Sequence, residues 1–257
     1  MNVRVLIIFS LLFFLFGVSY FNKDIFNPTI VISSCLVALL TQMLFALAYR
    51  APLNSVFSAL ITSLLLILII RSDYNFIYCL ATLFAIASKF LIRIENRQYI
   101  NPTVFGVMSV YFFMGNSLFT IPQIPFYLIV SFLCINLLIL GFYKVLKMHT
   151  FLTYIILITT YFLIFKSGED YKIQNIIILS SFFLLDRSSL PNSNFSKIIM
   201  GILIFFTQIF LNHYVQMELS LILSVFIVSI LSPIFNIILR SPSFYWNGTN
   251  IRVLNEG

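Results

Sequence analysis

The sequence predicts an all-α, polytopic integral membrane protein with about ten transmembrane helices in a single domain, residues 1–257. Composition is the first reason: 61% of the residues are hydrophobic, 9% are charged, and the mean hydropathy is +1.05. Soluble domains carry about 25% charged residues, so this chain cannot cover a water-facing surface. Length is the second reason, because apolar runs recur near the roughly 20 residues that cross a hydrocarbon core. These runs do not alternate in polarity, as the strands of a transmembrane barrel would.

Ten apolar runs are expected to be helical. In chain order they are Val5–Tyr20, Thr29–Ala48, Leu53–Ile70, Tyr74–Ala87, Thr103–Met114, Pro125–Tyr143, Phe151–Phe165, Ile173–Leu185, Ile198–Val215 and Leu219–Leu239. Several are short for a full crossing, which fits tilted helices or helices that end part-way and are buried in protein. Arg4 precedes the first run, whose apolar core is long and rich in phenylalanine. We interpret this run as an uncleaved signal anchor, with a cleaved signal peptide as the alternative.

Basic residues predict the orientation of these helices. With the N-terminus inside, the inner segments hold 11 of the 15 lysines and arginines, and the outer loops hold four. Lysine and arginine collect in cytoplasmic loops, so both termini are expected in the cytoplasm and the chain in the plasma (bacterial inner) membrane. The net charge of +7 arises from cations placed singly at the ends of apolar runs. It therefore indicates the lipid bilayer as a partner, and no nucleic acid.

The densest cluster of charge lies between the fourth and fifth runs, in residues 85–106. Lys89, Arg93 and Arg97 are spaced four residues apart and would share one face if the fourth helix continued through them. Asn101-Pro102 is expected to end that helix, because the residue before proline avoids the α region. Proline suits the first turn of the next helix and Asn101 can cap it. A cationic helix end would then face a helix N-terminus, an arrangement that favours an anion; anchoring to lipid headgroups is the alternative interpretation.

A weaker copy of this pattern lies near Asp186. Asp186-Arg187 follows the eighth run, and Leu190-Pro191-Asn192 precedes the ninth. Repeats with broken helices at matching positions are typical of transporter-like folds. On the predicted topology this loop lies on the same cytoplasmic side as residues 85–106.

The polar groups inside the runs are mainly neutral amides, which we expect to bond between helices as packing contacts. No aspartate or glutamate lies near the middle of a run, which disfavours a proton- or sodium-coupled carrier. The two histidines and three cysteines fit no metal motif. Nucleophile elbows, phosphate loops and nucleotide fingerprints are absent, so no catalytic residue is expected. The amides are Gln42, Asn136, Gln208, Asn212 and Asn236.

Three segments resemble one known family. The run Ser88–Arg93 followed by Asn101-Pro102-Thr103-Val104-Phe105-Gly106 resembles a signature of the RnfD/NqrB family. That family comprises the D subunit of the Rnf electron-transport complex and the B subunit of the sodium-pumping NADH:quinone reductase. The segment from Pro52 to Ser63 is similar to the family's third helix, and Asp186–Pro191 to its second loop. The resemblance extends from about Pro52 to Pro233.

The chain departs from the family where covalent flavin would attach. Members with covalent flavin use a threonine in a Ser/Thr-Gly-Ala-Thr motif, which would fall in the outer loop after the fifth run. Here Thr120 is the one threonine in residues 115–124, and it is not part of that motif. A second departure is Arg187, at a position where the family tends to have proline. We therefore expect no covalent FMN.

The resemblance implies a membrane subunit of an Rnf/Nqr-like electron-transport system, working with other membrane redox subunits. Its role would be to hold a non-covalent flavin (FMN or riboflavin) or a quinone, or to scaffold its partners. The expected contact residues are Lys89, Arg93, Asn101, Pro102 and Asp186. Because the family's fold is similar to that of urea-type transporters, a small-solute channel or carrier is the alternative. A structural assembly factor without a ligand is a third possibility.

Overall fold

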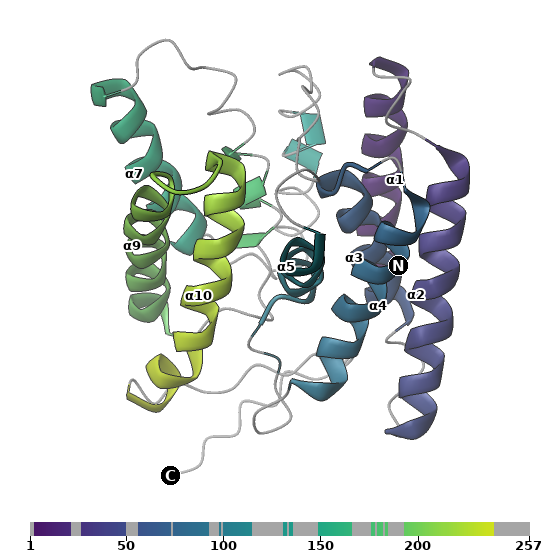
Figure 1. The fold of residues 1–257 in the computed structure, drawn as a ribbon. Helices are drawn as coiled ribbons and strands as arrows, with labels where there is room; N and C mark the ends of the chain where they lie inside the picture. The colour runs from purple at the N-terminus through teal and green to yellow at the C-terminus, as the bar shows by residue number, and fades with distance from the viewer. Residues whose placement is uncertain are drawn as a thin grey trace.

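A computed structural model describes most of the predicted helical segments. It covers residues 3–21, 27–49, 56–72, 74–92, 98, 100–114, 131–132, 134–135, 149–165, 176–177, 179–181, 183–184 and 193–238. Within these ranges every element is an α-helix (Figure 1). The helices are α1 Val3–Phe21, α2 Pro28–Ala48, α3 Val56–Ile69, α4 Asn75–Leu91, α5 Pro102–Met114, α7 His149–Phe165, α9 Asn194–Leu211 and α10 Met217–Ile238.

The described helices match eight of the ten predicted runs, which confirms the all-α class. Most of the sixth run and almost half of the eighth lie outside the described residues. The largest shifts are at α4, which continues to Leu91, and at α9, which begins at Asn194. Both helices therefore take in a lysine that the sequence assigned to a polar connection.

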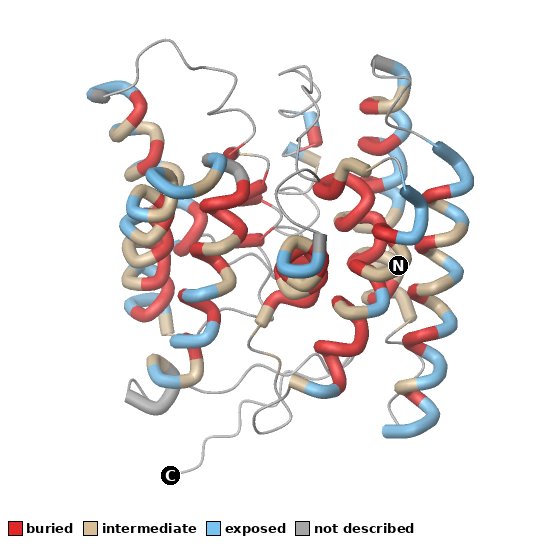
Figure 2. Tube along the Cα trace, viewed as in Figure 1, coloured by how far each residue is buried: buried red, intermediate tan, exposed pale blue. Residues whose placement is uncertain are grey.

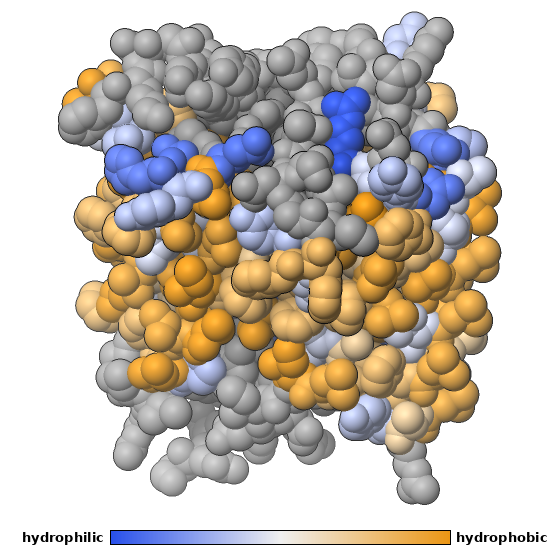
Figure 3. Space-filling model, in the orientation of Figure 1, coloured by the Kyte–Doolittle hydropathy of each residue, from blue (hydrophilic) through white to orange (hydrophobic). Residues whose placement is uncertain are grey.

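Two of the described helices, α2 and α9, are long and apolar enough to cross a membrane. Length and composition of two helices give weak support for a membrane location. Large apolar side chains lie on the outer surface, with Leu47 77% and Leu163 81% exposed. The outward residues of α2 and α9 are exposed while their inward residues are buried (Figure 2). Hydrophobic residues form a broad band across the middle of the visible face (Figure 3), and extended apolar patches of this kind mark contact with membrane or protein.

Helices α2, α3 and α4 pack closely through small side chains. Ala38 of α2, Ala59 of α3 and Ile86 of α4 are fully buried in one cluster with Phe90. Thr29 of α2 contacts Asn75 of α4, and farther along Phe45 stacks on Phe90 with ring centroids 5.2 Å apart. The two helices therefore run in the same direction. Small residues allow this close approach, which is how helices associate where water does not drive them together.

Helix α5 lies at the centre of the molecule. Figure 1 views it nearly along its axis, whereas α2, α9 and α10 are seen from the side, so α5 lies across them. Its 13 residues extend only about 20 Å. Val104, Val107 and Met108 are fully buried, and large exposed side chains occur at its C-terminal end, at Phe112 and Phe113. It is thus a short helix enclosed by protein, as expected for one of the short runs.

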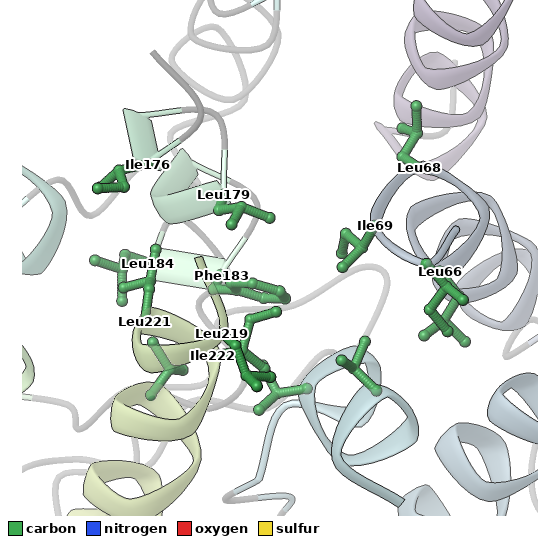
Figure 4. Packing of buried hydrophobic residues seen from close by; sticks show 14 of the residues in the cluster. Leu66, Leu68, Ile69, Ile176, Leu179, Phe183, Leu184, Leu219, Leu221 and Ile222 are labelled. Carbon is green, nitrogen blue, oxygen red and sulfur yellow. The ribbon is translucent and has the colours of Figure 1, made fainter. Parts of the chain in front are cut away.

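The C-terminal helices form a second packed group. A turn over residues 212–216 joins α9 to α10. Phe183 lies near Leu219 and Ile222 at the start of α10 (Figure 4), within the cluster that also contains Met108 of α5. Phe105 of α5 and Phe226 of α10 have ring centroids 6.3 Å apart. One apolar core therefore connects α5 to both groups of helices.

Candidate functional site

Lys89 is buried in the interior rather than extended toward lipid headgroups. Its side chain is 5% exposed. The ammonium Nζ donates to the Ser58 carbonyl oxygen at 3.0 Å, to Ser58 Oγ at 3.1 Å and to Thr62 Oγ1 at 2.7 Å. These are three acceptors for the three donors of a lysine. Without them, burial of the charge would cost several kcal/mol.

Helix α3 supplies all three acceptors because Ser58 and Thr62 are one turn apart. Residues four apart share a helix face, so both hydroxyls point toward α4. The Thr62 hydroxyl donates to the Ser58 carbonyl oxygen at 2.8 Å and is thereby oriented to accept from Lys89. Lys89 therefore binds α4 to α3 and places a positive charge in the low-dielectric interior.

The Asn101-Pro102 step begins α5 as the sequence predicts. Asn101 is 3% exposed, and its Oδ1 accepts from the Thr103 backbone N–H at 2.9 Å. Its carbonyl oxygen accepts from the Phe105 N–H at 3.0 Å. Pro102 is the first helical residue, where its missing N–H costs nothing. The start of α5, with its partial positive charge, is therefore capped and buried.

Helices α4 and α5, which carry Lys89 and Asn101, touch at Gly106. A Cβ built on Gly106 would lie 2.6 Å from the Ala81 carbonyl oxygen and 2.8 Å from Ala85 Cβ. Lys89 is one turn beyond Ala85, about 6 Å along the helix, and Asn101 is about 7.5 Å from Gly106. A buried ammonium and a buried helix N-terminus thus lie about one helical turn from the α4–α5 contact.

Two expectations about residues 85–106 need correction. Asn101-Pro102 does not end the fourth helix: α4 stops at Leu91 and Ile92 is its C-cap. Consequently Lys89 is the only one of the three cations in α4, and the condition for a shared cationic face, a fourth helix that continues to Arg97, is not met by this helix. The physical reason is that helices in proteins are stabilised mainly by burying an apolar stripe, and the sequence after Ile92 has none. Arg93, Arg97 and Asp186 lie outside the described residues.

The interhelical bond expected of a buried amide is present at Gln208. Its Oε1 accepts from the hydroxyl of Tyr154, and both side chains are fully buried. The bond joins α9 to α7. Gln42 is 1% exposed within the α2–α3–α4 group, and Asn212 is the C-cap of α9. Asn136 and the side chain of Asn236 lie outside what the structure describes.

The sequence did not lead us to predict the roles of several residues that are important in the structure. Asn27-Pro28 starts α2 with the geometry of Asn101-Pro102, since Asn27 Oδ1 accepts from the Thr29 N–H at 3.0 Å. The Asn-Pro dipeptide, which predicted the start of α5, could have predicted the start of α2 as well. The Ser58 and Thr62 pair had a weaker signal, two hydroxyls four residues apart in an apolar run. Lys197, assigned to a loop, is 1% exposed within α9.

Comparison with protein-family models and with curated proteins gives no match for this chain. Among the described residues, no group of three histidine, cysteine, aspartate or glutamate side chains could hold a metal ion. The candidate site is therefore defined by its own chemistry: a buried cation, a buried helix N-terminus and the hydroxyls of α3.

Proposed function

We propose that the chain is a ten-span membrane subunit of an Rnf/Nqr-like electron-transport system. Its place would be the plasma (bacterial inner) membrane, with both termini in the cytoplasm and other membrane redox subunits as partners. Support comes from the eight apolar helices, the exposed apolar surface and the resemblance that the Ser88–Gly106 stretch carries. The C-terminal end of α4 and the N-terminal end of α9 lie at the same lower end of the molecule (Figure 1). This agrees with a topology that puts both polar loops on one side.

The role we propose is to hold a non-covalent flavin, FMN or riboflavin, or a quinone beside Lys89 and Asn101. The buried ammonium of Lys89, about one turn along α4 from its contact with α5, is the observation that supports it. Flavins and quinones gain negative charge when reduced, and two neighbouring positive groups stabilise that charge in a low-dielectric site. Lys89 would act mainly through its field, because its three donors already bond to α3. Pro102 and Asn101 would fix the direction of α5, while Arg93 and Asp186 are the further contacts that the family resemblance suggests.

Flavin retention in variants of Lys89 tests this role. Lys89→Met keeps most of the side-chain volume but removes the charge, and is expected to lower the bound flavin per protein about tenfold, whereas Lys89→Arg retains part of it. Arg71→Met is the matched control, since it removes a cation beyond the far end of α3. Equal flavin content in Lys89→Met and wild type would contradict the assignment. The assignment would also be contradicted if the protein purified from native membranes without any redox subunit.

A small-solute channel or carrier is the second candidate, and the shape of α5 favours it. A short, enclosed helix whose N-terminus lies inside a bundle is the element that positions substrates in many transporters. This candidate predicts solute flux into liposomes that contain the protein, with loss of flux in Asn101→Ala or Asp186→Asn. It also predicts a colourless protein. Flavin retention and liposome flux therefore separate the two candidates.

A further inference from the structure

Two hydroxyls in the α2–α3–α4 group are buried without a hydrogen bond. Ser34 of α2 and Thr82 of α4 are both 0% exposed, and within the described part of the chain neither hydroxyl has a partner. A helical serine or threonine can satisfy its hydroxyl by donating to a carbonyl oxygen one turn back, as Thr41 does to Val37 at 2.7 Å. Because buried side-chain polar atoms rarely lack a partner, the two hydroxyls indicate that a further group binds there.

The packing of α2 against α4 places the two hydroxyls at the same level. Ala38 of α2 and Ile86 of α4 belong to one buried cluster, and the two helices run in the same direction. Ser34 is one turn before Ala38, and Thr82 is one turn before Ile86. Residues four apart share a helix face. Ser34 and Thr82 therefore lie one turn from the same contact, on the faces that make it.

Helix α3 adds a third buried hydroxyl at this level. Ala59 packs in the same cluster as Ala38, and Ser63 is one turn after Ala59. The Sγ of Cys35, the residue after Ser34, lies 3.6 Å from Ser63 Oγ. Larger residue numbers in α2 thus pair with smaller ones in α3, so these two helices are antiparallel. Ser63, which is 0% exposed, consequently lies on the same level as Ser34.

The hydrogen bonds of Ser63 show what it can offer to a ligand. Its hydroxyl donates to the Leu60 carbonyl oxygen at 2.9 Å. A hydroxyl has one donor and two acceptor positions, so the Cys35 thiol is the donor in its contact with Ser63. One acceptor position of Ser63 is left, whereas Ser34 and Thr82 still have a hydrogen to donate. The group that fits must therefore both accept and donate hydrogen bonds.

We propose that Ser34, Ser63 and Thr82 bind one internal water molecule. The water accepts from Ser34 and Thr82 and donates to Ser63, which gives the roughly three hydrogen bonds of a typical buried water. An anion does not fit, because the Ser63 hydrogen is already used within α3. A cation is repelled by the ammonium of Lys89, which bonds Thr62, the residue before Ser63. The water joins α2 to the hydroxyls that bind α4 to α3, and the site does not depend on the proposed flavin.

Thr82→Val tests the site in solution, because it keeps the side-chain shape and removes the hydroxyl. The assay is reversible unfolding of the full-length protein in mixed micelles with sodium dodecyl sulfate. Loss of one hydrogen bond to the water should raise the unfolding equilibrium constant about fivefold. Ser34→Ala should act similarly, and the two losses should not add, because either change breaks the bridge. Thr41→Val, at a buried threonine that bonds within its own helix, is the matched control and should change the constant by about twofold or less.

A Thr82→Val protein as stable as wild type, or more stable, overturns the proposal, because removing a hydroxyl that has no ligand costs nothing. A crystal structure of the wild-type protein that shows ordered water tests the site without any variant. Density is expected within about 2.5–3.0 Å of both Ser34 Oγ and Thr82 Oγ1. No density there, a direct bond between the two hydroxyls, or hydroxyls turned onto carbonyl oxygens of their own helices would each overturn the water site. An anomalous signal at that position in crystals grown with bromide would also overturn it, because the bound group would be an anion.

Discussion

Gly106→Ala tests the close contact of α4 and α5, on which the geometry of the candidate site depends. The added Cβ would lie 2.6 Å from the Ala81 carbonyl oxygen, whereas ordinary contact begins at 3.4 Å, so the helices must separate by about 0.8 Å. A backbone oxygen cannot rotate away as a side chain can. Overpacking of this kind costs about 1–3 kcal/mol. Because the contact is with a backbone oxygen at 2.6 Å, we expect the upper half of that range, about 2–3 kcal/mol. Alanine also gains about 1 kcal/mol in helix propensity over glycine, which leaves an expected net loss of about 1–2 kcal/mol.

The measurement is reversible unfolding in mixed micelles with increasing sodium dodecyl sulfate, followed by circular dichroism. Ala85→Gly serves as the companion change, because it removes the second contact, at 2.8 Å, but leaves the Ala81 carbonyl in place. The double variant should therefore recover only part of the lost stability. A Gly106→Ala protein as stable as wild type, or more stable, would refute the close packing. Full recovery in the double variant would show that the carbonyl contact does not limit the approach of the helices.

Three further predictions concern single hydrogen-bonding groups. Tyr154→Phe leaves Gln208 Oε1 buried without its donor and should cost about 1–3 kcal/mol in the same unfolding assay, whereas adding Gln208→Leu should restore much of that loss. Asn101→Ala removes the cap of α5 and should cost about 1 kcal/mol, while Asn101→Asp, which can still accept the Thr103 N–H, should be nearer to wild type. Thr62→Val removes one acceptor of Lys89 and should cost about 1.5–3 kcal/mol; a loss below 0.5 kcal/mol, within the range of ordinary surface substitutions, would mean that the ammonium has found another partner.

Local chemistry made the helices predictable. Apolar runs bounded by polar residues gave the existence and type of each described helix, and Asn101-Pro102 gave the start of α5 to within one residue of the predicted run. The predicted helix boundaries are wrong where tertiary packing, rather than hydropathy, determines where a helix begins or ends. The sequence assigned Lys197 and the end of α4 to connections because lysine is costly in lipid, yet both lysines are buried. The decisive partners, Ser58 and Thr62, are 27 or more residues from Lys89 in sequence, so no local pattern shows the contact.

The candidate site was predictable only in part for the same reason. The sequence predicted a cation near a helix N-terminus; in the structure Lys89 is a buried cation and Asn101 caps the start of α5. It could not indicate that the Lys89 donors turn toward α3, because that depends on which helices are neighbours. Gly106 and Gly201 carry a signal in retrospect, since each allows one helix to approach another closely. Which helix approaches is a property of the tertiary fold.

The absorbance spectrum of the detergent-purified protein, before and after denaturation, tests the central claim most directly. A non-covalent flavin beside Lys89 predicts a yellow protein whose flavin bands separate from the chain when it is denatured and filtered. Reduced occupancy in Lys89→Met, with full occupancy in Arg71→Met, would assign the bands to this site. A colourless protein that purifies alone would contradict the electron-transport role. Colour that stays with the denatured chain would contradict the expectation of non-covalent binding.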